Sequence, residues 1–205
     1  MGKRELDTRD RILKAAGEEF LEKGYQDAWL REISRKAGVT TGAMYGYFKN
    51  KEELFGALVE EDYNHMLGLY DEILADFRTL PPQEQAEHMQ EYTAQGMLRM
   101  ADYLYNHWDS FQLMLCHSEG TPYNHLVEEM VARDVQATDD FSQSSRDAGI
   151  ALNPVNPTLG RMLLSSMFSP FFEMVRQDLP RDQAEQYITQ LLSFFVAGWE
   201  RLWGC

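Results

Sequence analysis

The sequence predicts an all-α fold, and three observations lead to this class. The seven prolines lie mostly at joints, and the segments of about 20 to 40 residues between them repeat apolar side chains with helical spacing. No run of alternating β-branched residues indicates a strand. Several joints place a capping side chain just before a helix. Together these features predict about nine helices.

The first helix is expected from Thr8 to Lys23, and Gly24 is placed to end it in a left-handed conformation. Its apolar face holds four residues: Ile12, Leu13, Ala16 and Phe20. A second helix near Trp29–Ala37 has its own apolar face, made of Leu30, Ile33 and Ala37. Both helices therefore have one face suited to a shared core.

The second helix is followed by a tight turn at Gly38 and a very short helix, Thr41–Tyr47. This order is typical of a helix-turn-helix, whose second helix enters the DNA major groove. The outward residues are small or hydroxylic, which suits close backbone approach and hydrogen bonds to phosphates or bases. They are Thr40, Thr41, Gly42, Ala43 and Tyr47. A fourth helix begins after Asn50, which precedes Glu53 in a capping-box arrangement.

Residues 8–55 resemble the amino-terminal DNA-binding domain of TetR-type transcriptional regulators. Three blocks of sequence support the resemblance: ILKAAGEEFLEKGY, REISRKAGVTTGAMYGYF and KNKEELF. It implies a helix-turn-helix domain over residues 1–55 and a larger helical ligand-binding and dimerisation domain over residues 56–205.

The resemblance also implies roles for individual residues. Thr40, Thr41, Gly42 and Ala43 correspond to positions that face the bases, and Tyr45 and Tyr47 to phosphate contacts. Lys51 matches the lysine at the start of the fourth helix, where a cation and free backbone N–H groups favour an anion. Two alternatives stay open: Thr40 acts only as a helix cap, and the ring of Tyr45 belongs mainly to the core.

One position departs from the family pattern. Family members usually have serine or threonine just before the second helix, whereas this chain has Ala28-Trp29. We expect Asp27 to cap that helix instead, and Trp29 to pack on the domain rather than on DNA.

Later joints predict further helices. Thr121-Pro122 and Asn156-Pro157 each place a capping residue before a proline at the first helical position. Pro170 lies inside the apolar stretch Leu159–Val175, which is either one kinked helix or two helices meeting at Ser169.

The last helix, near Arg181–Trp203, is apolar over so wide an arc that it must bury two sides. With the Leu159–Val175 segment it is expected to form half of a two-fold four-helix interface, and so a homodimer. The predicted interface residues are Leu163, Phe171, Leu191, Phe195 and Trp199.

Residues 83–130 are rich in methionine and aromatic side chains, which form either plain core or an apolar ligand pocket. The resemblance favours the pocket. Its predicted lining is Met97, Met100, Tyr103, Trp108, Phe111, Met114, Phe168 and Phe172. Four acidic residues nearby are interpreted as a solvated face rather than as a site for a cationic ligand: Glu91, Asp102, Asp109 and Glu119.

The net charge of −14 argues at first against a nucleic-acid partner. However, residues 1–60 hold 11 basic and 11 acidic residues and include all six lysines, whereas residues 61–205 hold 8 basic and 22 acidic residues. The acidic excess thus lies in the part that need not touch DNA.

Other classes of protein are not supported. No apolar run is long enough to span a bilayer, and the start is no signal peptide, so a cytoplasmic protein without a membrane partner is expected. The two cysteines build no disulfide framework. The histidines lack metal-ligand spacing, and no nucleophile motif is present, so neither a cofactor nor a metal nor an enzyme is expected.

The favoured function is a homodimeric, ligand-responsive repressor that binds a near-palindromic double-stranded DNA operator and is released by a small apolar or amphipathic effector. Its DNA binding should be salt-sensitive through Lys51 and the amino-terminal Lys3, Arg4 and Arg9. The alternative is a helical small-molecule-binding protein or enzyme whose helix-turn-helix no longer recognises DNA.

Overall fold

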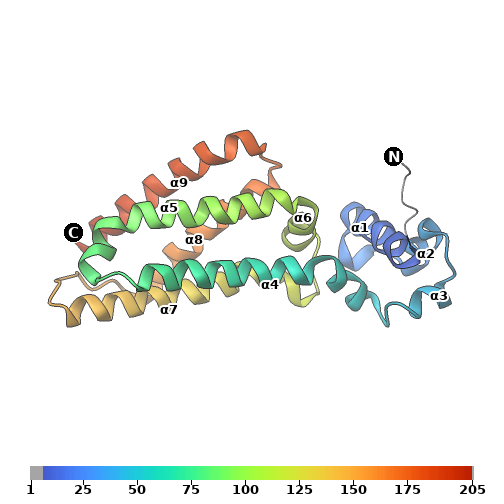
Figure 1. Cartoon of the computed structure of the whole chain (residues 1–205), viewed down its shortest axis with the longest axis horizontal. Helices are drawn as coiled ribbons and strands as arrows, with labels where there is room; N and C mark the ends of the chain where they lie inside the picture. The colour runs from blue at the N-terminus through green and yellow to red at the C-terminus, as the bar shows by residue number, and fades with distance from the viewer. Residues whose placement is uncertain (1–6, 205) are drawn as a thin grey trace. The chain divides into compact units, whose positions relative to one another are not determined.

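The computed structural model describes residues 7–204, and these residues form helices with no strand, which confirms the all-α prediction (Figure 1). Nine α-helices and one short 3-10 helix occur in this range. They are α1 (Thr8–Asp27), α2 (Leu30–Ala37), α3 (Thr41–Tyr45), α4 (Lys51–Arg78), α5 (Pro82–Asn106), α6 (Trp108–Cys116), η1 (Pro122–His125), α7 (Leu126–Asp147), α8 (Pro157–Arg176) and α9 (Arg181–Trp203).

The described chain packs as two compact units. The first unit holds the residues up to Asn64 together with His107–Asn124, and the second holds His65–Asn106 and the residues from His125 onward. The boundary between the two units therefore does not coincide with the predicted boundary between residues 55 and 56. The reason is that α6 packs against α1 and so belongs to the first unit. The functional division into residues 1–55 and 56–205 stays a prediction.

Gly24, Gly38 and Asn50 mark helix ends of the first unit as predicted, and Asp7 adds a cap that was not predicted. The side chain of Asp7 accepts a hydrogen bond from the N–H of Asp10 at 2.9 Å and caps α1. Gly24 has φ +76° and interrupts the helical conformation of α1, and Gly38 has φ +68° and ends α2. Asn50 Oδ1 accepts from the N–H of Glu53 at 2.7 Å at the start of α4. These left-handed glycines fix where the chain turns between helices.

Two expectations at the start of α2 are wrong. The residue in the capping position is Trp29, and no side chain caps the helix, so Asp27 does not take that role. The Trp29 side chain is 68% exposed rather than packed on the domain. The backbone at Trp29 is extended, and the buried face of α2 is formed by other residues, among them Ile33 and Ala37.

In the second unit, α8 is one continuous helix with Pro170 inside it, so of the two alternatives the single helix is confirmed. Asn156 caps it as predicted, accepting from the N–H groups of Thr158 and Leu159 at 2.9 and 3.2 Å. The Tyr187 hydroxyl of α9 donates to the carbonyl of Pro170 at 2.9 Å. The last two helices are thus tied together by a polar contact as well as by apolar packing.

The core of the second unit contains Phe168, Phe171 and Phe172, all of them inaccessible to solvent. Phe168 meets the ring of Tyr70 edge to face, with the ring centroids 5.3 Å apart. Burial of whole aromatic side chains is a large favourable term in folding, so these residues fix how α4 and α8 pack.

Candidate nucleic-acid interface and ligand cavity

The short helix α3 turns one face inward and leaves the rest exposed. Met44 points inward and is 1% exposed, and its sulfur lies 3.4 Å from the buried hydroxyl of Ser34 on α2. Among the predicted base-facing residues, Thr40, Gly42 and Ala43 are exposed and Thr41 is half-buried. The helix therefore presents a small, smooth surface that can approach a groove closely.

The alternatives for Thr40 and Tyr45 are now decided in part. The Thr40 hydroxyl accepts from the N–H of Ala43 at 3.1 Å, so this residue does cap α3. The rings of Tyr45 and Tyr47 are 49% and 47% exposed, so Tyr45 does not belong mainly to the core. Both phenol groups are available to a partner outside the domain.

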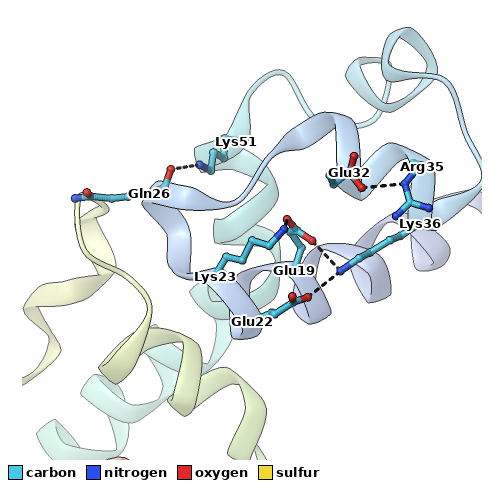
Figure 2. A network of polar contacts seen from close by, with 8 residues as sticks. All are labelled: Glu19, Glu22, Lys23, Gln26, Glu32, Arg35, Lys36 and Lys51. Carbon is cyan, nitrogen blue, oxygen red and sulfur yellow. Dashed lines mark hydrogen bonds and ion pairs between the residues drawn. The ribbon is translucent and has the colours of Figure 1, made fainter.

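Lys51 makes contacts within the protein that the sequence did not predict. Its ammonium donates to the carbonyl of Gln26 at 2.9 Å (Figure 2). The same group lies 4.9 Å from the centre of the Tyr25 ring. Burial lowers the pKa of Lys51, and the nearby Asp27 carboxylate partly offsets this effect. The contact ties the start of α4 to the end of α1, and it leaves two of the three ammonium N–H groups for an anion.

A buried carboxylate joins α1 to α2 through ion pairs. Glu19 is inaccessible to solvent, and its two oxygens lie 3.0 Å from Lys23 Nζ and 2.7 Å from Lys36 Nζ (Figure 2). Burial by itself raises the pKa of Glu19, but the two ammonium groups outweigh it and the pKa is lowered. Lys36 also reaches Glu22 at 3.3 Å. The network fixes the angle between α1 and the helix-turn-helix.

The second unit contains a partly open cavity of about 130 Å³. Its lining comes from α4, α5, α7, α8 and α9, and it includes seven aromatic rings and four methionines. Sulfur-containing and aromatic walls of this kind adapt to the shape of an apolar ligand.

One polar pair interrupts this apolar lining. The Tyr70 hydroxyl of α4 donates to Asp134 Oδ1 of α7 at 2.6 Å. Burial raises the pKa of Asp134 to about 6, an effect that this hydrogen bond from Tyr70 partly opposes. Burial likewise raises the pKa of Tyr70, and the neighbouring Asp134 carboxylate adds to the rise. Sequence reasoning missed Asp134, although an acidic residue on the apolar stripe of Met130, Ala137 and Phe141 is a usable signal.

The structure separates the eight predicted pocket residues. Met97 and Met100 line the cavity. Phe168 and Phe172 are fully buried in the core, and Tyr103 stacks on His65, with the ring centroids 4.0 Å apart. Trp108, Phe111 and Met114 lie on α6 in the first unit, where Phe111 and Met114 are buried. The prediction placed the cavity too near α6, because residues that are apolar on α6 pack in that unit's own core.

The predicted interface residues are also divided. Phe171 and Trp199 are buried within one chain and cannot form a surface contact, so that part of the prediction is wrong. Leu163, Leu191 and Phe195 are half-buried, and Phe195 lines the cavity. The apolar residues that α8 and α9 do expose are Leu159, Met162, Phe194 and Leu202, and Met162 and Phe194 are the most open, at 65% and 73%.

The remaining candidates give no site. Glu91, Asp102, Asp109 and Glu119 are all exposed, as expected for a solvated face. No group of histidine, cysteine and acidic side chains within residues 7–204 has the arrangement of a metal site. No helix of the described chain is long and apolar enough to cross a membrane. Lys3 and Arg4 lie outside the described residues.

An exposed short helix, held by a glycine turn on a buried three-helix core, defines the class of helix-turn-helix proteins. Comparison with known proteins supports this assignment to the helix-turn-helix class. Residues 12–58 match the family model described as bacterial regulatory proteins, tetR family. YdgC, an HTH-type transcriptional regulator of Bacillus subtilis (strain 168), is 37% identical over 71 residues, which cover 35% of this chain and 36% of YdgC. The aligned segment thus spans about a third of that relative's length.

Two comparisons extend over nearly the whole chain. YhgD, another HTH-type transcriptional regulator of B. subtilis (strain 168), is 24% identical over 196 residues, 93% of this chain and 95% of YhgD. The structure of the regulator FadR from B. subtilis, solved in complex with stearoyl-CoA, has the same fold, with a TM-score of 0.56, 20% identity, and coverage of 92% of this chain and 97% of FadR. The amino-terminal part of the chain is therefore similar to the TetR family of bacterial regulatory proteins.

Proposed function

We propose that this protein is a dimeric transcriptional repressor that binds a near-palindromic operator through α3 and releases it when a small ligand occupies the cavity. The observation that best supports the proposal is the exposure of Thr40, Ala43, Tyr45 and Tyr47 around one buried anchor, Met44. A helix with exposed hydroxyl, methyl and phenol groups on a rigid base suits the DNA major groove.

The contacts divide into two kinds. Thr41 and Ala43 face base edges, where a hydroxyl and a methyl group distinguish one sequence from another. Tyr45, Tyr47 and Lys51 contact phosphates, which position the helix without specifying sequence. Gly42 has no side chain and so lets the backbone come close to the DNA. Packing within the protein does not require glycine here, because an added side chain would meet only open space.

Dimerisation uses the exposed apolar residues of α8 and α9. Met162 and Phe194 are large, open to water in one chain, and carried by the two helices expected at a two-fold four-helix interface. A second copy of the chain would bury both. The two α3 helices would then meet half-sites about one helical turn apart, about 34–36 Å.

Release requires only that the ligand prefer the arrangement of protomers that does not fit the operator. A coupling of about 1–3 kcal/mol between the two sites is typical and is enough for a several-fold to hundredfold change in operator affinity. The cavity is an appropriate size and character for such an effector.

Fluorescence anisotropy with DNA from beside the protein's own gene tests the proposal against random DNA. Lys51→Ala should weaken binding to both DNAs similarly, whereas Thr41→Ala should reduce the preference for the operator. Arg146→Ala, which removes an exposed cation of α7, is the matched control and should change neither. Equal loss on both DNAs for both variants would contradict these assignments. No binding at low salt would favour the alternative function, a helical ligand-binding protein or enzyme.

A further inference from the structure

The cavity of the second unit has aromatic walls and a single residue that is charged at neutral pH. Among the described residues that line it, Asp134 is the one carboxylate, and no lysine, arginine or histidine is present. Two hydroxyl groups, from Thr93 and Thr138, add hydrogen-bonding capacity. The cavity is thus negatively charged and mostly apolar.

The protein does not neutralise this charge. Asp134 accepts one hydrogen bond, from the neutral hydroxyl of Tyr70, and no basic side chain of the described chain lies within ion-pair distance of it. The guanidinium of the adjacent Arg133 is taken by Asp71 at 3.1 Å and Glu129 at 3.1 Å. A carboxylate in apolar surroundings without a cation is costly to fold, so a role in binding accounts for its presence.

We propose that the cavity binds an organic cation, an amine with a ring-sized apolar body, whose ammonium group pairs with Asp134. The inference rests on the proposed function in one respect only, namely that this cavity is the effector site. It names the chemistry of the effector, which the fold alone does not specify.

The aromatic walls favour the same ligand class. Trp199 and Trp203 lie with ring centroids 4.9 Å apart, and Phe77 lies 5.8 Å from Tyr92. All four rings line the cavity. Aromatic faces attract cations through the ring quadrupole, and they bind the apolar body of a ligand equally well. A carboxylate ligand would instead be repelled by Asp134.

The volume limits the size of the ligand. A dry apolar cavity of about 150 Å³ in another protein holds a benzene molecule, and this cavity measures about 130 Å³. A single ring with a short chain fits if the lining gives way slightly. Four methionines in the wall, Met89, Met97, Met100 and Met167, provide that adaptability.

Three probes of nearly equal size separate charge from shape: 2-phenylethylamine, propylbenzene and phenylacetate. Their binding to the full-length protein without DNA is measured by calorimetry at pH 7.5. We expect the amine to bind at least tenfold more tightly than propylbenzene, and phenylacetate to bind most weakly. A propylbenzene affinity equal to or greater than that of the amine would overturn the proposal, as would failure of all three to bind.

Two variants locate the effect. Asp134→Asn keeps the size of the side chain and its hydrogen bond from Tyr70, and it should reduce amine affinity at least tenfold while leaving propylbenzene binding unchanged or stronger. Asp139→Asn removes an exposed charge from the same helix and should leave all three affinities unchanged. Equal amine affinity in wild type and Asp134→Asn would refute the site.

The proposed function is tested separately, by measuring operator binding. A protein that binds its operator but does not prefer the amine would refute the amine site and leave the regulator function intact. A protein that prefers the amine through Asp134 but binds no DNA would support the site and refute the regulator function.

Discussion

Replacing Asp134 with asparagine should stabilise the protein at neutral pH and have no such effect in acid. The pKa of Asp134 is raised by burial from 3.8 to about 6. Because the folded state holds this proton more tightly than the unfolded state, the group's contribution to stability falls as pH rises from about 4 to about 6 and stays low above that range. Asparagine does not titrate, so the variant escapes this loss.

The pKa change sets the size of the effect. A rise from 3.8 to about 6 corresponds to roughly 3 kcal/mol as an upper limit. Asp134 is only partly buried, so the expected gain at pH 7.5 is about 1–3 kcal/mol. Asparagine keeps an oxygen to accept the Tyr70 hydrogen bond, and no buried donor is left without a partner.

Urea unfolding followed by circular dichroism at pH 4, 5, 6 and 7.5 tests this effect of pH. The protein concentration is held constant, because the proposed dimerisation would add to stability. The difference between Asp134→Asn and wild type should grow from near zero at pH 4 to its plateau above pH 6. Asp139→Asn should show no such trend. A difference that is independent of pH, or a variant less stable than wild type at pH 7.5, would show that the charge of Asp134 does not destabilise the folded protein.

Three further changes have defined outcomes. Glu19→Gln removes the buried charge between Lys23 and Lys36 and should lower the free energy of unfolding in urea by about 1–3 kcal/mol at pH 7. Because the pKa of Glu19 is lowered in the folded state, the difference from wild type should shrink as pH falls below about 4.5. A difference that stays constant with pH would contradict the stabilising role of the ion pairs. Phe194→Asp places a charge on the most exposed apolar residue of α9 and should convert the proposed dimer to a monomer in light scattering, while Thr189→Asp on another face of the helix should not; a dimer that persists in Phe194→Asp would exclude this surface. Lys51→Ala should lower the slope of log affinity against log salt concentration by about 1, and an unchanged slope would show that Lys51 does not contact phosphate.

Local sequence signals predicted the first unit well, because its helices begin and end through contacts a few residues apart. Asn50 caps α4 at the expected place, and Gly24 and Gly38 take left-handed conformations. Asn156 caps α8 in the second unit in the same way. A cap or a left-handed glycine depends on its neighbours in the chain, so its position can be inferred from the sequence.

Side-chain orientation was harder to predict where it depends on distant parts of the chain. Trp29 was expected to pack and is exposed, whereas Phe171 and Trp199 were expected at an interface and are buried. Apolar residues on neighbouring stripes of one helix are alike in sequence, and only the packing of α8 and α9 decides which stripe turns inward.

The position of the cavity was predicted too close to α6 for the same reason. Methionine and aromatic residues fill both the core near α6 and the cavity lining, so composition cannot separate them. Asp134 is the opposite case, since a single acidic residue on an apolar stripe is visible in the sequence and indicates either a buried partner or a ligand.

A hydroxyl-radical footprint of the purified protein on DNA beside its gene shows whether α3 binds an operator. Two protected half-sites of related sequence are expected, with centres about one helical turn apart, about 34–36 Å. Both should be lost from the Tyr45→Ala, Tyr47→Ala double variant. Uniform protection of the DNA, or protection that the double variant retains, would show that α3 does not bind an operator in this way.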